Sequence, residues 1–293
     1  MFLEFNTTKK YDLNTETKIP TSQGALYKAT DLYFNRTVAV KEIHIAGKTK
    51  RERSQNYKKA HEETRALASL QSPLIHTPKI YDDWYDEKNA VYYIVMDWIE
   101  GKTLREKFSL NSEEKGEVLY WIRELCLVLQ AMGKEHMFHK DIKPDNIMIA
   151  KDGSVWLLDF NITIGPANLI EGTPNYKAPE MEHGSKSADR SKVDIFAIGV
   201  MLYEYFTGSV PINGIDYGLK NKTKSQSRVD KWDYFTEPKE KNPKMTDAEN
   251  KLILRCMSYN PADRFKNYSD LNRALKSLNR NPKGESHVGK QKY

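Results

Sequence analysis

The sequence has 293 residues, and its 46 lysines and arginines exceed its 40 acids to give a formal net charge of +6. Hydrophobic residues make up 39% and charged residues 29% of the chain, which is the balance of a globular protein with a core of its own. This composition argues against a collagen-like chain, a low-complexity scaffold and an integral membrane protein. Because the positive charge is spread along the sequence, a solvated surface explains it better than nucleic-acid binding.

Neither the longest apolar run nor the N-terminus predicts a membrane or secretory segment. The run from Ile195 to Tyr203 is about half of the roughly 20 residues that a membrane span needs, so it predicts a buried helix. The N-terminus carries Glu4 where a signal peptide would carry bases. Cys126 and Cys256 lie in apolar helical patterns, which favours core positions over a disulfide or a metal site. We therefore expect a protein of the reducing cytoplasm.

The first hundred residues predict a sheet with one long helix. Branched apolar residues between turn residues indicate strands, at residues 25–31, 37–45, 78–83 and 91–97. A basic helix from Arg51 to Leu70 lies between the second and third of these strands and stops before Pro73.

The sequence after residue 101 predicts helices. Apolar residues recur every three or four positions from Val118 to Met132, behind a cap-like start at Asn111 and Glu114. Further helices are expected at residues 194–207, after a capping box of Thr246 and Glu249, and at residues 271–278. The polar, lysine-rich stretch 218–244 predicts a long surface loop with helical fragments.

These elements predict an α+β protein with two lobes. A small β-rich N-lobe with one long helix would occupy residues 1–97, and a larger, mainly helical C-lobe would occupy residues 98–280. The basic tail, residues 281–293, has almost nothing apolar, and we expect it to be disordered.

The residues around Asp141 have a pattern suited to phosphoryl transfer. Asp141 can accept a hydroxyl proton, Lys143 can neutralise the moving phosphate, and Asn146 can bind a metal ion. A hairpin signal follows at Asp152-Gly153, and a strand that returns from it would bring Asp159 beside Asn146. Two oxygen ligands on neighbouring strand ends suit Mg²⁺.

Five motifs in order make the sequence similar to a eukaryotic-type serine/threonine protein kinase domain, with the bilobal fold of that family. They are Val38-Ala39-Val40-Lys41, His139-Lys140-Asp141 with Asn146, Asp159-Phe160-Asn161, Gly172-Thr173-Pro174 ending in Ala178-Pro179-Glu180, and Asn260-Pro261-Ala262-Asp263-Arg264. The resemblance extends over residues 11–278. It implies transfer of the ATP γ-phosphate to serine and threonine hydroxyls of protein substrates, with autophosphorylation.

The resemblance also implies a role for each catalytic residue. Asp141 would be the catalytic base and Lys143 the phosphate clamp. Lys41 would hold the α- and β-phosphates and pair with a glutamate of the long helix. Glu62 and Glu63 are both available, and the spacing from the end of the helix favours Glu63.

The cofactors that the resemblance implies are ATP and Mg²⁺, with Mn²⁺ as an alternative metal. Asn146 and Asp159 would be the metal ligands. The residues expected to bind ATP are Ile19, Thr21, Gly24, Leu26, Ala39, Lys41, Met96, Asp97, Trp98, Ile99, Thr103 and Met148.

Other residues have structural roles in the resemblance. Thr173 would lie in the loop that receives the substrate, Glu180 would pair with Arg264, and Asp194 would anchor the catalytic loop. We expect His139 to be a packed structural histidine rather than a base.

The sequence departs from the family in its phosphate-binding loop. The three glycine positions fall on Ile19, Thr21 and Gly24, so only one of them is glycine. Glycines let backbone N–H groups approach a phosphate without a Cβ in the way, and Pro20 donates no N–H at all. The sequence therefore predicts weak ATP binding in a retained fold.

Two more departures concern activation. Asn161 stands where glycine is usual, and Lys140 stands where arginine is usual. Lysine cannot grip a phosphate with a planar fork, and residues 164–172 contain no Ser, Thr or Tyr. We therefore expect activity without phosphorylation of this activation segment.

Two other functions compete with an active protein kinase. The altered glycine positions favour a pseudokinase that acts as a nucleotide-tuned binding module, whereas the retained catalytic and metal-binding residues argue against it. Small-molecule kinases of related fold generally lack the Ala-Pro-Glu segment and its arginine, so Glu180 and Arg264 argue against that class. The sequence names neither the protein substrate nor the oligomeric state.

Overall fold

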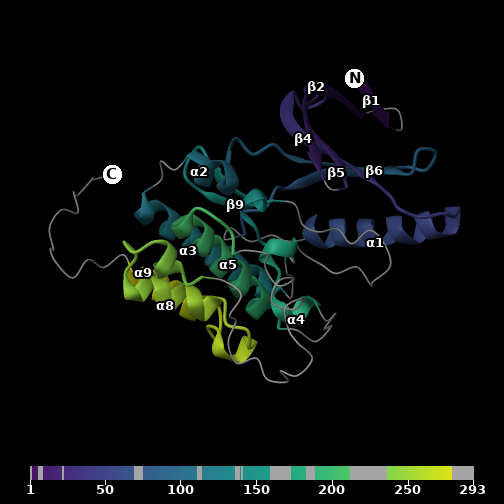
Figure 1. Ribbon diagram of the computed structural model, residues 1–293. Helices are drawn as coiled ribbons and strands as arrows, with labels where there is room; N and C mark the ends of the chain where they lie inside the picture. The colour runs from purple at the N-terminus through teal and green to yellow at the C-terminus, as the bar shows by residue number, and fades with distance from the viewer. Residues whose placement is uncertain are drawn as a thin grey trace.

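A computed structural model describes residues 2–5, 9–21, 23–68, 75–110, 114–135, 139, 141–158, 173–182, 189–211 and 236–278. Figure 1 shows a sheet with one long helix beside it, and a separate group of helices packed together. This arrangement confirms the predicted α+β fold with a β-rich and a helical lobe. The predicted tail and the activation segment 164–172 lie outside the described residues.

The N-lobe is built on one antiparallel sheet with the strand order β1-β2-β3-β4-β6-β5. Its strands are β1 (Phe2–Phe5), β2 (Lys9–Thr21), β3 (Gly24–Asp31), β4 (Arg36–His44), β5 (Ile80–Asp86) and β6 (Val91–Asp97). The sequence pattern predicts the last four but not β1 and β2. Among the described side chains of β2 only Tyr11 and Leu13 are buried, so this strand carries almost no apolar alternation.

The two faces of the sheet have different partners. Cross-strand neighbours share a face, and one face carries a cluster of buried side chains at Tyr11, Leu13, Ala25, Tyr27, Ala29, Val38, Val40 and Val95. The opposite face carries Ile43, Tyr92 and Ile94, which pack with Ala60 of the long helix. The sheet is therefore held by an apolar layer on one side and by the helix on the other.

The long helix α1 (Lys50–Ala68) begins with a reciprocal cap. The amide of Glu52 donates to Thr49 Oγ1 at 3.1 Å, and the Glu52 carboxylate accepts from the amide of Thr49. Ala60 and Thr64 are almost fully buried, so the face of α1 that turns toward the sheet runs along this part of the helix.

The C-lobe contains a small sheet and most of the helices. Its small sheet has the order β7-β8-β9, and its elements are β7 (Gly101–Thr103), α2 (Leu104–Leu110), α3 (Lys115–Lys134), β8 (Ile147–Ala150), β9 (Val155–Leu157), α4 (Pro179–Glu182), α5 (Arg190–Thr207), α7 (Pro238–Lys241), α8 (Asp247–Cys256) and α9 (Tyr268–Leu278). Helix α3 packs against α9, and α5 packs against α8.

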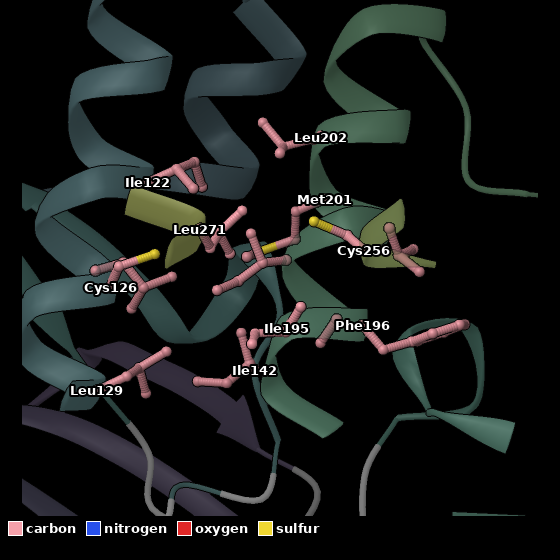
Figure 2. Close-up of a cluster of buried hydrophobic side chains, with 14 of the residues drawn as sticks. Ile122, Cys126, Leu129, Ile142, Ile195, Phe196, Met201, Leu202, Cys256 and Leu271 are labelled. Atoms are coloured by element: carbon pink, nitrogen blue, oxygen red, sulfur yellow. The ribbon is translucent and has the colours of Figure 1, made fainter. Parts of the chain in front are cut away.

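Figure 2 shows apolar side chains of α3, α5 and α9, among them Ile122, Ile195 and Leu271, gathered in the core of the C-lobe. Cys126 and Cys256 are both buried free thiols in this core. Burial raises the pKa of Cys126 to about 12, so the thiol stays protonated and unreactive at neutral pH. The prediction that both cysteines are small core residues is confirmed.

The structure differs from the sequence predictions at three points in the C-lobe. Helix α2 is not predicted, although Thr103 and Glu106 have the spacing of a capping box. Helix α5 begins at Arg190, before the predicted start, because the Asp189 carboxylate accepts from the amide of Ser191. Glu114 is the N-cap of α3 but makes no side-chain cap bond.

Among the described helices, none combines the length and the apolar character of a membrane span.

A glycine at the α5–α8 contact gives a test of the core packing. A Cβ on Gly199 would lie 2.6 Å from Cys256 Cβ and 2.8 Å from Met257 Cγ, whereas a Cβ on Gly133 of α3 would meet no atom within 4 Å. We expect Gly199→Ala to lower the free energy of unfolding in urea by about 1–3 kcal/mol through overpacking. Gly133→Ala should raise it by about 0.5–1 kcal/mol. A Gly199→Ala variant at least as stable as the wild type would contradict this packing.

Candidate active site

The carboxylate of Asp141 is the centre of a compact polar site. Its Oδ1 accepts from the amide and the hydroxyl of Thr173, each at 2.8 Å. Its Oδ2 lies 2.9 Å from Lys143 Nζ and 3.2 Å from Asn146 Nδ2. Lys143 Nζ also donates to Thr173 Oγ1 at 2.9 Å. The structure thus brings together four residues that the sequence predicts to belong to one site.

These bonds decide the charge of Asp141. Burial raises the pKa of the carboxyl group, but the hydrogen bond and positive charge of Lys143 and the two bonds from Thr173 outweigh burial and lower the pKa below its ordinary 3.8. Asp141 is therefore ionised at neutral pH. An ionised carboxylate can accept a proton from a hydroxyl.

The local backbone explains how Asn146 reaches the site. A short 3₁₀ turn, Pro144–Asn146, begins with a proline whose fixed φ suits the first position. The Asn146 side chain donates to the backbone oxygen of Asp141 at 2.8 Å. The amide of Leu158 donates to the backbone oxygen of Asn146, also at 2.8 Å. The chain therefore returns to Asn146 at the residue before Asp159, and Asp159 itself lies outside the described residues.

The side chain of Asn146 is oriented for a cation. Its Nδ2 hydrogens are both directed at Asp141. Toward the described residues, its carbonyl oxygen Oδ1 is left for a ligand. Such an oxygen suits Mg²⁺. Among the described residues there is no group of three or more His, Cys, Asp or Glu side chains that could hold a metal ion. The second ligand that the resemblance implies, Asp159, lies outside the described residues.

His139 has a structural position. It is 1% exposed, and its Nε2 donates to the backbone oxygen of Leu158 at 2.6 Å. This bond ties the chain just before Asp141 to Leu158, which follows β9 and bonds Asn146. It agrees with the expectation of a packed histidine.

Lys41 lies on strand β4 of the N-lobe sheet, and Glu63 lies on helix α1, which packs against that sheet. Lys41 on β4 is 5% exposed, and a buried ammonium needs an anionic partner. On α1, Glu63 is partly buried and Glu62 is exposed. The helix therefore turns Glu63, between the buried Ala60 and Thr64, toward the sheet, which supports the choice of Glu63.

Several of the predicted ATP-binding residues share one face of the N-lobe sheet. Ile19 pairs with Leu26 and Leu26 with Lys41, while Ala39 pairs with Met96. Cross-strand partners lie side by side on the same face, and alternation puts Ala39 on the face of Lys41. Met148 on β8 is only partly covered, between the buried Ile147 and Ile149. This set can supply an apolar slot for an aromatic base.

The hairpin between β2 and β3 gives one residue of the predicted phosphate loop, Gly24, a structural role. Thr21 pairs directly with Gly24, so the turn is tight. A Cβ on Gly24 would lie 2.2 Å from the backbone oxygen of Glu42. This glycine is therefore required by the close approach of β4, and phosphate binding is not needed to explain it. Thr21 Oγ1 is buried with no hydrogen-bond partner in the described part of the chain, and a phosphate oxygen would satisfy it.

The segment between the lobes contains the other predicted ATP-binding residues. Asp97, Trp98 and Ile99 are partly buried at the end of β6. The Asp97 side chain accepts from the amide of Lys79 at 2.8 Å and from the hydroxyl of Tyr81, and the amide of Asp97 donates to the backbone oxygen of Lys79 at 3.0 Å. These bonds fix the end of β6 beside the start of β5. Thr103 caps α2, because its Oγ1 accepts from the amide of Glu106 at 3.1 Å.

A buried ion pair holds the segment that carries Thr173. Glu180 and Arg264 form two parallel hydrogen bonds of 2.8 Å, and Arg264 is 1% exposed. The bidentate geometry is the strong form of this interaction. The pairing that the resemblance implies is thus present, although its partners lie far apart in the sequence.

Asp194 has a partner that the sequence does not reveal. Its Oδ2 accepts from the hydroxyl of Tyr268 on α9 at 2.7 Å, and both residues are buried. The bond fixes the base of α5, where the resemblance places the anchor of the catalytic loop.

The residues that sequence reasoning misses form a second polar cluster, made of Arg105, Asp145, Tyr176 and Glu204. We call it the Arg105 cluster. One signal was available, since Glu204 is an acid that directly follows the apolar run of α5. The other three residues have no distinguishing pattern in a single sequence.

The model of the protein kinase domain family matches residues 21–275 of the chain. The chain belongs to the protein kinase family. The five motifs and the site around Asp141 fall within the matched range, whereas β1 and nearly all of β2 precede it.

The curated relatives include serine/threonine-protein kinases from bacteria and an Aurora kinase from a yeast. The chain is 27% identical over 263 residues to serine/threonine-protein kinase PrkC of Bacillus subtilis, covering 86% of this chain and 38% of PrkC. It is 31% identical over 267 residues to a probable serine/threonine-protein kinase of Clostridium acetobutylicum, covering 87% and 38%. It is 29% identical over 250 residues to Aurora kinase of Schizosaccharomyces pombe, covering 83% and 64%. The chain spans well under half the length of the two bacterial relatives.

The charge of Asp141 leads to a pH prediction for this kinase domain. A carboxyl group whose folded-state pKa is depressed stays ionised above its ordinary value and protonates only as the pH falls through the lowered pKa. In Lys143→Met the pKa of Asp141 should rise, because a neighbouring positive charge is lost. We expect the acid limb of log kcat/KM against pH to move to higher pH in this variant.

The matched control is Lys151→Met, which removes a lysine that is exposed and pairs with Glu100 on the surface. Its acid limb should coincide with that of the wild type. An acid limb that stays in place in Lys143→Met would show that Lys143 does not control the ionisation of Asp141.

Proposed function

We propose that this kinase domain is catalytically active and transfers the γ-phosphate of ATP to serine and threonine hydroxyls of proteins, its own included. The observation that supports this best is the surroundings of Asp141. Its carboxylate is buried and ionised, and Oδ1 already accepts a hydrogen bond from the aliphatic hydroxyl of Thr173 at 2.8 Å. A general base for serine and threonine needs this geometry.

The residues around Asp141 divide the work. Asp141 orients the acceptor hydroxyl and takes its proton. Lys143, which contacts Asp141 and Thr173 together, places a positive charge where the phosphate arrives. Asn146 offers Oδ1 to the metal ion. When bound, ATP supplies the phosphoryl group, and Mg²⁺ neutralises its negative charge.

The N-lobe residues hold the nucleotide in this proposal. Leu26, Ala39 and Met148 border the adenine, and Lys41 with its partner Glu63 binds the α- and β-phosphates. The buried Oγ1 of Thr21 supplies one donor to phosphate where the family has glycine.

The pseudokinase remains the second candidate, because one observation favours it. Gly24 is explained by the backbone of Glu42, so the β2–β3 hairpin has no glycine whose only role is to bind phosphate. A pseudokinase would bind nucleotide without transferring phosphate.

The test that separates the two functions is phosphate transfer from labelled ATP and Mg²⁺ to a generic protein substrate. We expect transfer to serine and threonine by the wild type, and a kcat lower by about 10²–10⁴-fold in Asp141→Asn, because the general base is lost. Nucleotide binding, measured by calorimetry, should survive in Asp141→Asn.

The matched control is Asp152→Asn, which changes an exposed aspartate in the turn between β8 and β9. Its turnover should equal that of the wild type. Wild-type-like turnover in Asp141→Asn would refute the proposed role of this residue. Nucleotide binding without any transfer by the wild type would establish the pseudokinase instead.

A further inference from the structure

Arg105 of α2 is bonded to three other parts of the C-lobe. Its Nη1 contacts Glu204 of α5, and its Nη2 donates to the Tyr176 hydroxyl at 2.5 Å and lies 3.3 Å from Asp145 Oδ2. The Tyr176 hydroxyl in turn donates to the other oxygen of Glu204 at 2.5 Å. One guanidinium group therefore satisfies two carboxylates and a phenol oxygen.

The Arg105 cluster directly adjoins the site around Asp141. Tyr176 ends the short turn that Thr173 begins, since its amide donates to the backbone oxygen of Thr173 at 3.0 Å. Asp145 belongs to the same 3₁₀ turn as Asn146. The two segments that contact Asp141, residues 173–176 and 144–146, therefore both lead into the Arg105 cluster. The cluster lies beside the place where an acceptor hydroxyl would be held.

Without its arginine, the Arg105 cluster would be an acidic subsite open to solvent. The side chain of Arg105 is 33% exposed and that of Asp145 is 49% exposed, whereas that of Glu204 is 13% exposed. Two carboxylates in this arrangement would attract a cation, and the planar fork of a guanidinium fits them best. An arginine from a substrate peptide would make the same bonds that Arg105 makes.

We propose that Arg105 fills, from within the chain, a guanidinium-binding subsite beside the acceptor position, and that it thereby sets substrate specificity. The wild-type kinase then has little preference for arginine near the phosphorylated serine or threonine. Loss of Arg105 exposes Asp145 and Glu204 and creates such a preference. This inference rests on the proposed function, because it concerns the protein substrates of the same site.

A purely structural role for Arg105 makes a different prediction. If the arginine only tied α2 to α5 and to the turn at Tyr176, its loss would slow the phosphorylation of all peptides alike. If Arg105 sets specificity, its loss changes the ratio of kcat/KM between two peptides that differ in one charge. That ratio is insensitive to a general loss of active enzyme.

The experiment uses peptides with one serine, each carrying arginine or its neutral isostere citrulline at one of the flanking positions. The measured quantity is the ratio of kcat/KM for the arginine peptide to that for the citrulline peptide. In the wild type we expect a ratio within about threefold of one at every position. In Arg105→Ala we expect a rise of about tenfold or more at one position, because hydrogen bonds to charged groups discriminate by that order.

Three further variants control the result. Arg105→Lys keeps the positive charge and should stay close to the wild-type ratio. Adding Glu204→Gln to Arg105→Ala should remove most of the gained preference. Arg273→Ala, which removes an exposed arginine of α9, should leave both the activity and the ratio unchanged. If Arg105→Ala fails to fold, Arg105→Gln keeps the length of the side chain and should show the same gain.

Binding of the fluorescein-labelled arginine and citrulline peptides, measured by anisotropy without ATP, separates this inference from the proposed function. A pseudokinase would transfer no phosphate, yet Arg105→Ala would still bind the arginine peptide more tightly than the wild type does. Unchanged ratios and unchanged binding in both Arg105→Ala and Arg105→Gln would overturn the inference. A strong arginine preference in the wild type would overturn it as well.

Discussion

Arg264 is buried in the C-lobe with a bond for each of its five guanidinium N–H groups. Two go to Glu180, and the others go to the backbone oxygens of Lys192, Ser258 and Tyr259. Removing one partner of such a buried pair typically costs about 3–5 kcal/mol, because it leaves a charge without compensation. The pair fixes α4 against α5, and so it fixes the segment from Thr173 to Glu180. In that position Thr173 reaches the carboxylate of Asp141.

The site is assembled from parts that are rigid for separate reasons. Asn146 is held by the 3₁₀ turn at Pro144, by the amide of Leu158 and by the backbone oxygen of Asp141, while burial and three neighbours hold Asp141. The N-lobe contributes through the faces of its sheet, since strand pairing alone aligns Leu26 with Lys41. The positions of the site residues therefore depend on strand register in the N-lobe and on the buried Glu180–Arg264 pair in the C-lobe.

Local signals in the sequence predict the parts of the molecule that are determined locally. Periodic apolar residues predict α3, and branched residues predict β3, β4 and β6. The spacing of Asp141, Lys143 and Asn146 is short enough to be recognised directly. Sequence reasoning fails at β2, which has few buried side chains, and at α2, although the Thr103-x-x-Glu106 spacing was available as a signal. The Arg105 cluster could not be predicted, because Arg105 and Glu204 are separated by 99 positions and meet only in the folded chain.

We infer that the Glu180–Arg264 pair holds the segment from Thr173 to Glu180 in the position where Thr173 contacts Asp141. The most direct measurement is a double-mutant cycle on kcat/KM with Glu180→Gln, Arg264→Met and both together, at a temperature where circular dichroism shows all four proteins folded. We expect each single variant to lose at least about tenfold, and the double variant to lose no more than the worse single one, because both changes break one interaction. Single variants with wild-type activity, or losses that multiply in the double variant, would contradict the account.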